Sequence, residues 1–82
     1  MLFNTIVRVY LKEGVLDPQG KTIGQAMANL GFSNIIGIST GKIFKLEINA
    51  DSEADAKKVA QQAAERLLAN PVIERFEFEI QR

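Results

Sequence analysis

Residues 2–12 read LFNTIVRVYLK, and apolar and polar side chains alternate along this stretch. Alternation with a period of two, rich in β-branched and aromatic residues, is typical of a strand with one buried face. The residues expected on the buried face are the odd-numbered ones, Phe3, Thr5, Val7, Val9 and Leu11. The stretch therefore predicts a strand that anchors the core of the protein.

A helix is expected after the Gly- and Pro-containing loop at 13–20. Asp17 is a favourable N-cap residue, and Pro18 suits the first helical position. Apolar residues then recur at the helical spacing i, i+4, i+7, namely Ile23, Met27 and Leu30. Gly31 predicts the end of this helix, because glycine takes the left-handed conformation at low cost.

A β-hairpin is expected next, because residues 34–40 and 43–49 both have strand character and Gly41-Lys42 between them is typical of a turn. A second helix is predicted to open at Asp51, with Ser52 as its N-cap, and to end at Asn70-Pro71. Its predicted apolar stripe consists of Val59, Ala60, Ala63 and Leu67.

A last strand is predicted over residues 72–80, with its alternate apolar residues facing inward: Val72, Phe76, Phe78 and Ile80. The order β-α-β-β-α-β is that of the ferredoxin-like sandwich. We therefore expect a single α+β domain over residues 1–82, with two helices covering one face of a four-stranded antiparallel sheet.

The other face of this sheet would carry scattered apolar residues, Ile6 and Tyr10 among them, between charges of both signs. Two interpretations stay open. Scattered apolar residues are normal on a solvated surface. A chain of 82 residues without disulfides also often gains stability by oligomerising, so the face could be a self-association surface.

The composition argues against several classes of protein. Ten basic and ten acidic residues give no net charge, whereas a nucleic-acid binder usually carries a basic excess. The chain has no Cys and no His, so it lacks thiolate chemistry and the commonest metal ligand and general base. No apolar stretch reaches the roughly 20 residues of a membrane span, and residues 1–10 do not resemble a signal peptide. We expect a cytoplasmic protein with no nucleic-acid or membrane partner.

The segment from Gly14 to Thr22 resembles a phosphate-binding P-loop, because it follows a strand and ends in Gly-Lys-Thr. Five residues separate Gly14 from Gly20, however, where a P-loop has four. Pro18 also lacks one of the backbone N–H donors that such a loop needs. A turn followed by a capped helix explains the segment better, and we assign no catalytic residue, cofactor site or metal site to this chain.

Three segments together resemble the PurS family, the small subunit of phosphoribosylformylglycinamidine synthase. They are residues 11–21, LKEGVLDPQGK; the Gly41-Lys42 pair; and residues 67–74, LLANPVIE. The resemblance runs in the same order along the whole chain. It implies a role in de novo purine synthesis, where the enzyme converts formylglycinamide ribonucleotide, glutamine and ATP to formylglycinamidine ribonucleotide, glutamate, ADP and phosphate.

The resemblance also implies partners. A glutaminase subunit releases ammonia, and a large synthetase subunit uses ATP and magnesium. The small subunit, itself a dimer or a tetramer, bridges the two and supports ammonia transfer without an active site of its own. The residues for which the motif match implies partner contacts are Lys12, Asp17, Gln19, Gly20, Lys42 and Asn70.

Two positions depart from the family pattern. Ser39 stands where such subunits often carry an arginine, and Arg75 stands where they often carry an acidic residue. We therefore carry over no salt bridge at either position. The competing interpretation is a free-standing ferredoxin-like regulatory domain that binds a small metabolite at a dimer interface.

Overall fold

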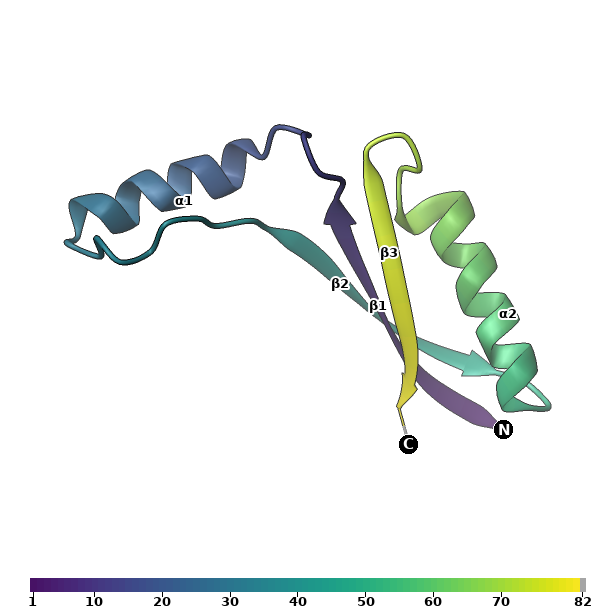
Figure 1. Cartoon of the computed structure of the whole chain (residues 1–82). Coiled ribbons are helices and arrows are strands. Elements are labelled where there is room, and N and C mark those ends of the chain that lie inside the picture. The colour runs from purple at the N-terminus through teal and green to yellow at the C-terminus, as the bar shows by residue number, and fades with distance from the viewer. Residues whose placement is uncertain (82) are drawn as a thin grey trace.

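The computed structural model describes residues 1–81 as three strands and two helices (Figure 1). In chain order the elements are β1 (Leu2–Leu11), α1 (Pro18–Asn29), β2 (Gly41–Asn49), α2 (Glu53–Ala63), the π-helical turn η1 (Ala64–Leu68) and β3 (Glu74–Gln81). The strands form one antiparallel sheet in the order β2-β1-β3. The prediction of a four-stranded sheet is therefore wrong.

The missing strand is the one expected at residues 34–40. This segment is extended but has no ladder partner, and it leads straight into β2 (Figure 1). Gly41 and Lys42 do not form a turn, because they are the first residues of β2 and pair with Tyr10 and Val9 of β1. Without a reversal at this point the segment cannot reach the free edge of its own sheet, so the predicted hairpin is absent.

Helix α1 and the extended segment project from the sheet as an arm, which we define as residues 18–40 (Figure 1). The prediction that both helices cover one face of the sheet is therefore wrong for α1. The arm gives the molecule extents of 51 × 27 × 14 Å and a radius of gyration of 16.3 Å. A compact domain of this length has a radius of gyration of about 12 Å. The arm thus leaves much of its surface uncovered.

Both predicted ends of α1 are confirmed. The Asp17 side chain caps the N-terminus by accepting from the backbone N–H of Gly20, and Pro18 occupies the first position. At the other end Gly31 has φ +96°. The N–H groups of Gly31 and Phe32 donate to the carbonyls of Ala28 and Met27, respectively, which is the Schellman arrangement.

Within residues 1–81, no helix has the length and apolar character needed to cross a membrane.

Helix α2 packs on the sheet through a face of alanines. Ala56 and Ala60 of α2 and Ala64 of η1 are fully buried, and their small side chains let the helix lie close to the strands. The sheet contributes two fully or almost fully buried valines of β1, Val7 and Val9. Helix α2 therefore supplies the helical half of the core, as expected, although Ala60 is the one residue of the predicted stripe that is fully buried.

The π-helical turn at the end of α2 explains part of this difference. The N–H of Ala69 donates to the carbonyl of Ala64 over 2.9 Å, one residue further back than in an α-helix. The wider turn places Leu68 against the core and leaves Leu67 82% exposed. Val59 is also exposed. The prediction that Val59 and Leu67 belong to the buried stripe is wrong.

Strand β3 starts two residues later than predicted. Phe76, Phe78 and Ile80 pack against the core as expected. Val72, however, lies in the turn before the strand and is exposed. The reason is local, because residues 70–74 form a hydrogen-bonded turn that delays the first ladder pair to Leu11 and Glu74.

The outer face of the sheet pairs several of its charges within the chain. Arg8 Nη2 lies 2.7 Å from Glu79 Oε1, and the Tyr10 hydroxyl donates to Glu77 Oε1 over 3.0 Å. The Arg75 guanidinium lies 4.6 Å from the centre of the Tyr10 ring. The hydrogen bond to Glu79 raises the pKa of Arg8, and the one to Glu77 raises the pKa of Tyr10. Self-association through this face stays a prediction.

The buried side of β1 contains a hydroxyl without a hydrogen-bond partner in the described chain, that of Thr5, which is 1% exposed. Thr5→Val keeps the branched shape and removes the unpaired group. We expect a gain of about 1–2 kcal/mol in the free energy of unfolding, measured by urea denaturation. Thr22→Val is the matched control, because the exposed Thr22 hydroxyl donates to the Pro18 carbonyl. Equal effects at both positions would contradict the prediction.

Candidate functional site

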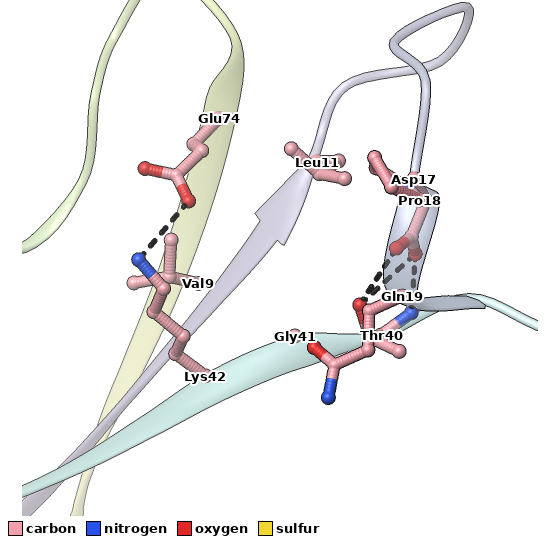
Figure 2. Close-up of a pocket in the computed structure, with 9 residues that line it drawn as sticks. All are labelled: Val9, Leu11, Asp17, Pro18, Gln19, Thr40, Gly41, Lys42 and Glu74. Carbon is pink, nitrogen blue, oxygen red and sulfur yellow. Dashed lines mark hydrogen bonds and ion pairs between the residues drawn. The ribbon is translucent and has the colours of Figure 1, made fainter. Parts of the chain in front are cut away.

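The six residues with implied partner contacts all lie near one end of the sheet. The arm leaves the sheet at this end, and the turn before β3 lies beside it. Asp17, Gln19 and Lys42 line a cavity of about 280 Å³ (Figure 2). Thr40 and Glu74 complete its polar lining. We call this cavity the arm-base cavity.

Asp17 connects the two ends of the arm. Its Oδ1 accepts from the Gly20 N–H over 2.9 Å, which caps α1. Its Oδ2 accepts from the N–H of Thr40 over 2.8 Å, and the Thr40 hydroxyl lies 3.0 Å from both carboxylate oxygens. Figure 2 shows the interactions of Asp17 with Thr40 as dashed lines. One carboxylate thus joins positions 23 residues apart, and we call the pairing of Asp17 with Thr40 the clamp.

These donors favour the charged carboxylate. The N–H groups of Gly20 and then Thr40 lower the pKa of Asp17, and the Thr40 hydroxyl adds to the effect. A carboxyl whose pKa is lower in the folded state than in the unfolded state stabilises the fold above the unfolded pKa. That contribution is lost as the pH falls through the folded pKa.

We expect the clamp to persist throughout the neutral range and to open only in acid. The amide proton of Thr40, followed by NMR, should keep its shift down to the ordinary aspartate pKa of about 3.9 and change only below it. Asp17→Asn, which has no carboxyl to titrate at this position, should remove the change. A Thr40 amide that responds between pH 5 and pH 7 would contradict the lowered pKa.

Glycines make room for the clamp. A Cβ atom on Gly20 would lie 2.8 Å from Asp17 Oδ2, and one on Gly41 would lie 2.8 Å from the Val9 carbonyl oxygen. Both distances are shorter than a carbon atom tolerates. The glycines therefore allow close approach, of α1 to the carboxylate and of β2 to β1.

Lys42 and Glu74 place opposite charges on the inner face of the sheet, on either side of Val9 (Figure 2). The Lys42 ammonium lies 3.8 Å from Glu74 Oε2. The side chain of Lys42 is 63% exposed and that of Glu74 only 12%. Glu74 Oε1 accepts from the Asn70 N–H over 2.7 Å, so the less exposed partner is held by the backbone.

Lys12 and Asn70 brace the turn before β3 and do not line the arm-base cavity. The side-chain Nζ of Lys12 donates to the Pro71 carbonyl over 2.6 Å, and the backbone N–H of Lys12 donates to the Ile73 carbonyl over 2.8 Å. Asn70 Oδ1 accepts from the N–H of Val72 over 3.0 Å. The motif residues thus fall into two neighbouring groups, which Glu74 connects.

Sequence reasoning did not select two residues of this site. Glu74 stood in the quoted 67–74 segment, and its position at the start of a strand was a usable signal. Thr40 offered no signal, because its role depends on the fold bringing it to Asp17. Of the two departures from the family pattern, Arg75 lies over Tyr10 on the opposite face, and Ser39 is exposed beside the clamp.

Comparison with known proteins relates the chain to one family along its whole length. A family model described as "PurS: Phosphoribosylformylglycinamidine (FGAM) synthase" matches residues 4–82. The PurS subunit of the synthase from Archaeoglobus fulgidus is 41% identical over 70 residues, covering 85% of this chain and 88% of that protein. The corresponding subunit of Bacillus subtilis is 34% identical over 80 residues, covering 98% and 94%.

Solved structures agree with the sequence relatives. The crystal structure of PurS from Methanocaldococcus jannaschii superposes with a TM-score of 0.86 at 35% identity, covering 98% of this chain and 96% of the other. A chain in the structure of PurLQS from Thermotoga maritima gives a TM-score of 0.91 at 30% identity, covering 99% of both. The projecting arm is included in these superpositions, because they cover nearly the whole chain. The chain therefore belongs to the PurS family.

Proposed function

We propose that this chain is the PurS subunit of a phosphoribosylformylglycinamidine synthase and acts there as a non-catalytic accessory subunit in purine biosynthesis. The observation that carries this proposal is the match over nearly the whole length to PurS subunits and to a chain of a PurLQS structure. The large synthetase subunit and the glutaminase subunit are the proposed partners, and the chain bridges them and supports ammonia transfer. ATP and magnesium belong to the large subunit, and the complex is cytoplasmic.

The arm-base site fits a contact role. Asp17 accepts from the backbone and side chain of Thr40, and Glu74 is held by the Asn70 backbone. The oxygens of these two carboxylates accept hydrogen bonds that hold the arm base and the turn before β3 in place. A subunit that shapes an interface needs such fixed surfaces and does not need a residue that transfers protons.

A second copy of this chain is the first partner that we propose, because the arm carries the two elements that a ferredoxin-like sandwich still lacks. The sheet has the order β2-β1-β3, so the outer edge of β2 is free to pair. Within the described part of the chain, the backbone N–H and C=O groups of residues 36–39 make no hydrogen bond. An extended segment with unpaired backbone groups pairs readily with the edge strand of another chain. The arm of one chain therefore supplies the fourth strand to the sheet of its partner.

The apolar surfaces agree with this exchange. The arm exposes four large apolar residues: Leu30, Phe32, Ile35 and Ile36, which are 76%, 50%, 43% and 99% exposed. The exposed Val59 of α2 and Leu67 of η1 lie with Ala63 on one flank of the helix. The opposite flank carries charges and faces Phe78 of β3. That apolar flank faces the position where the first helix of a ferredoxin-like sandwich would lie. The α1 helix of a partner would cover it, so each copy completes the core of the other.

Coexpression with candidate large and glutaminase subunits tests the proposed function. We expect all three chains to copurify and the complex to use glutamine as nitrogen donor. Omission of this chain should remove most of the glutamine-dependent activity and leave the ammonia-dependent activity largely intact. A two-subunit mixture with full glutamine-dependent activity would contradict the proposal.

A further inference from the structure

The junction between the arm and β2 has an unexpected geometry. Residues 39–42, Ser-Thr-Gly-Lys, have the composition of a hairpin turn, yet the chain continues straight through them (Figure 1). A two-residue turn at Gly41-Lys42 would make Thr40 and Ile43 a facing pair that exchanges backbone hydrogen bonds. The N–H of Thr40 would then be one of the donors that close the hairpin.

The clamp occupies that donor. The Thr40 N–H donates to Asp17 Oδ2 over 2.8 Å, and the Thr40 hydroxyl is held by both carboxylate oxygens. While Asp17 holds Thr40, the hairpin loses one of its closing hydrogen bonds. Gly41 and Lys42 meanwhile stay in the ladder with Tyr10 and Val9.

The two elements of the arm lie against each other. Gly20, Gly24 and Ala28 follow one another at helical spacing and line, with residues 35–38, the groove between α1 and the extended segment. A Cβ atom on Gly24 would lie 3.2 Å from Ile38 Cγ2, so the helix lies against this segment. A change at the base of the arm therefore redirects both elements together.

We propose that the clamp selects the open arm over a closed one. Released from Asp17, residues 39–42 can form the hairpin turn, residues 34–40 can pair with the free edge of their own β2, and α1 can cover its own sheet. The closed monomer and the exchanged dimer make the same contacts, within one chain or between two. The conformation of residues 39–42, the hinge, therefore decides which of the two forms. Asp17 acts here as a positioning residue. This inference rests on the arm-exchanged dimer of the proposed function.

The test separates the clamp from the helix cap. Asp17→Asn keeps a side-chain oxygen for the Gly20 N–H, since asparagine is as good an N-cap as aspartate, but replaces the second acceptor with an amide donor. A stronger variant adds Gly41→Asn and Lys42→Gly, which create the Asn-Gly turn preferred in hairpins. The matched control is Ser52→Ala, which weakens the cap of α2 and leaves the clamp intact.

Sedimentation over a range of concentrations and amide hydrogen exchange give the two readouts. We expect the dimer dissociation constant of Asp17→Asn to be at least about tenfold higher than that of wild type. We expect the triple variant to be a monomer. In that monomer the amides of Ile36 and Ile38 should be as protected as those of β2. Ser52→Ala should remain a dimer.

Four results would overturn the role of the clamp: Asp17→Asn with a wild-type dissociation constant, a triple variant that stays dimeric, a triple variant whose Ile36 and Ile38 amides exchange freely, or a triple variant that is unfolded. A wild-type protein that is itself monomeric at micromolar concentration would instead refute the exchanged dimer. None of these results decides whether the chain copurifies with the other subunits, which is measured separately.

Discussion

Ile35→Glu is expected to convert the proposed arm-exchanged dimer into a monomer. Ile35 is 43% exposed on the arm, and with Thr40 facing Ile43 the exchange would place it opposite Ile48, on the buried face of the partner's sheet. A glutamate at this position would bring a charge without a counterion into a contact surface in each half of the dimer. Leaving a charge unpaired in such a surface costs several kcal/mol. We expect the dissociation constant to rise at least about a thousandfold, equivalent to about 4 kcal/mol.

Analytical ultracentrifugation at micromolar concentration measures this effect. Val72→Glu is the matched control, because Val72 is also an exposed apolar residue, at 77%, but lies in the turn before β3. The control should remain dimeric. The Ile35 variant should also lose glutamine-dependent activity in the three-subunit complex, because the bridge is proposed to act as a dimer. If both variants dissociate alike, or neither does, the arm is not the dimer contact.

Ala60→Leu is expected to destabilise the fold more than any surface change. Ala60 is fully buried on the face of α2 that packs against Ile48, so the three further carbon atoms of leucine would enter the core. Overpacking of this kind costs about 1–3 kcal/mol, a large fraction of the stability of a small domain. The helix would have to move away from the sheet, which would also loosen the contacts of Ala56 and Ala64.

Urea denaturation of the protein measures the loss. Ala54→Leu serves as control, because Ala54 lies on the same helix, is exposed, and has a similar helix propensity after substitution. We expect a lowered midpoint for the Ala60 variant and a change within about 0.5 kcal/mol for the control. A neutral Ala60→Leu would show that α2 does not pack closely in solution.

Local chemistry predicted the elements whose ends depend on a few neighbouring residues. The alternation in residues 2–12 identified β1 and its buried face. Asp17 and Gly31 identified the two ends of α1, and Ser52 identified the start of α2. In each case the deciding interaction lies within a turn or a strand period, so a single stretch of sequence contains all the information.

The register within α2 could not be predicted in the same way. A regular helical repeat assigns Leu67 to the buried stripe, but the π-helical turn exposes Leu67 and turns Leu68 inward. The wider turn depends on how the helix end meets the turn at residues 70–74. That contact is not visible in the spacing of apolar residues.

By itself the sequence determined the positions of both helices and of the three strands that pair, the buried face of β1 and the family to which the chain belongs. Only the tertiary structure decided that residues 34–40 stay unpaired and that α1 projects from the sheet. The physical reason is that Thr40 can donate its N–H either to a neighbouring strand or to Asp17, a carboxylate 23 positions away along the chain. Strand propensity is equal in both cases, so the direction of the chain after Thr40 depends on a contact that exists only in the folded protein.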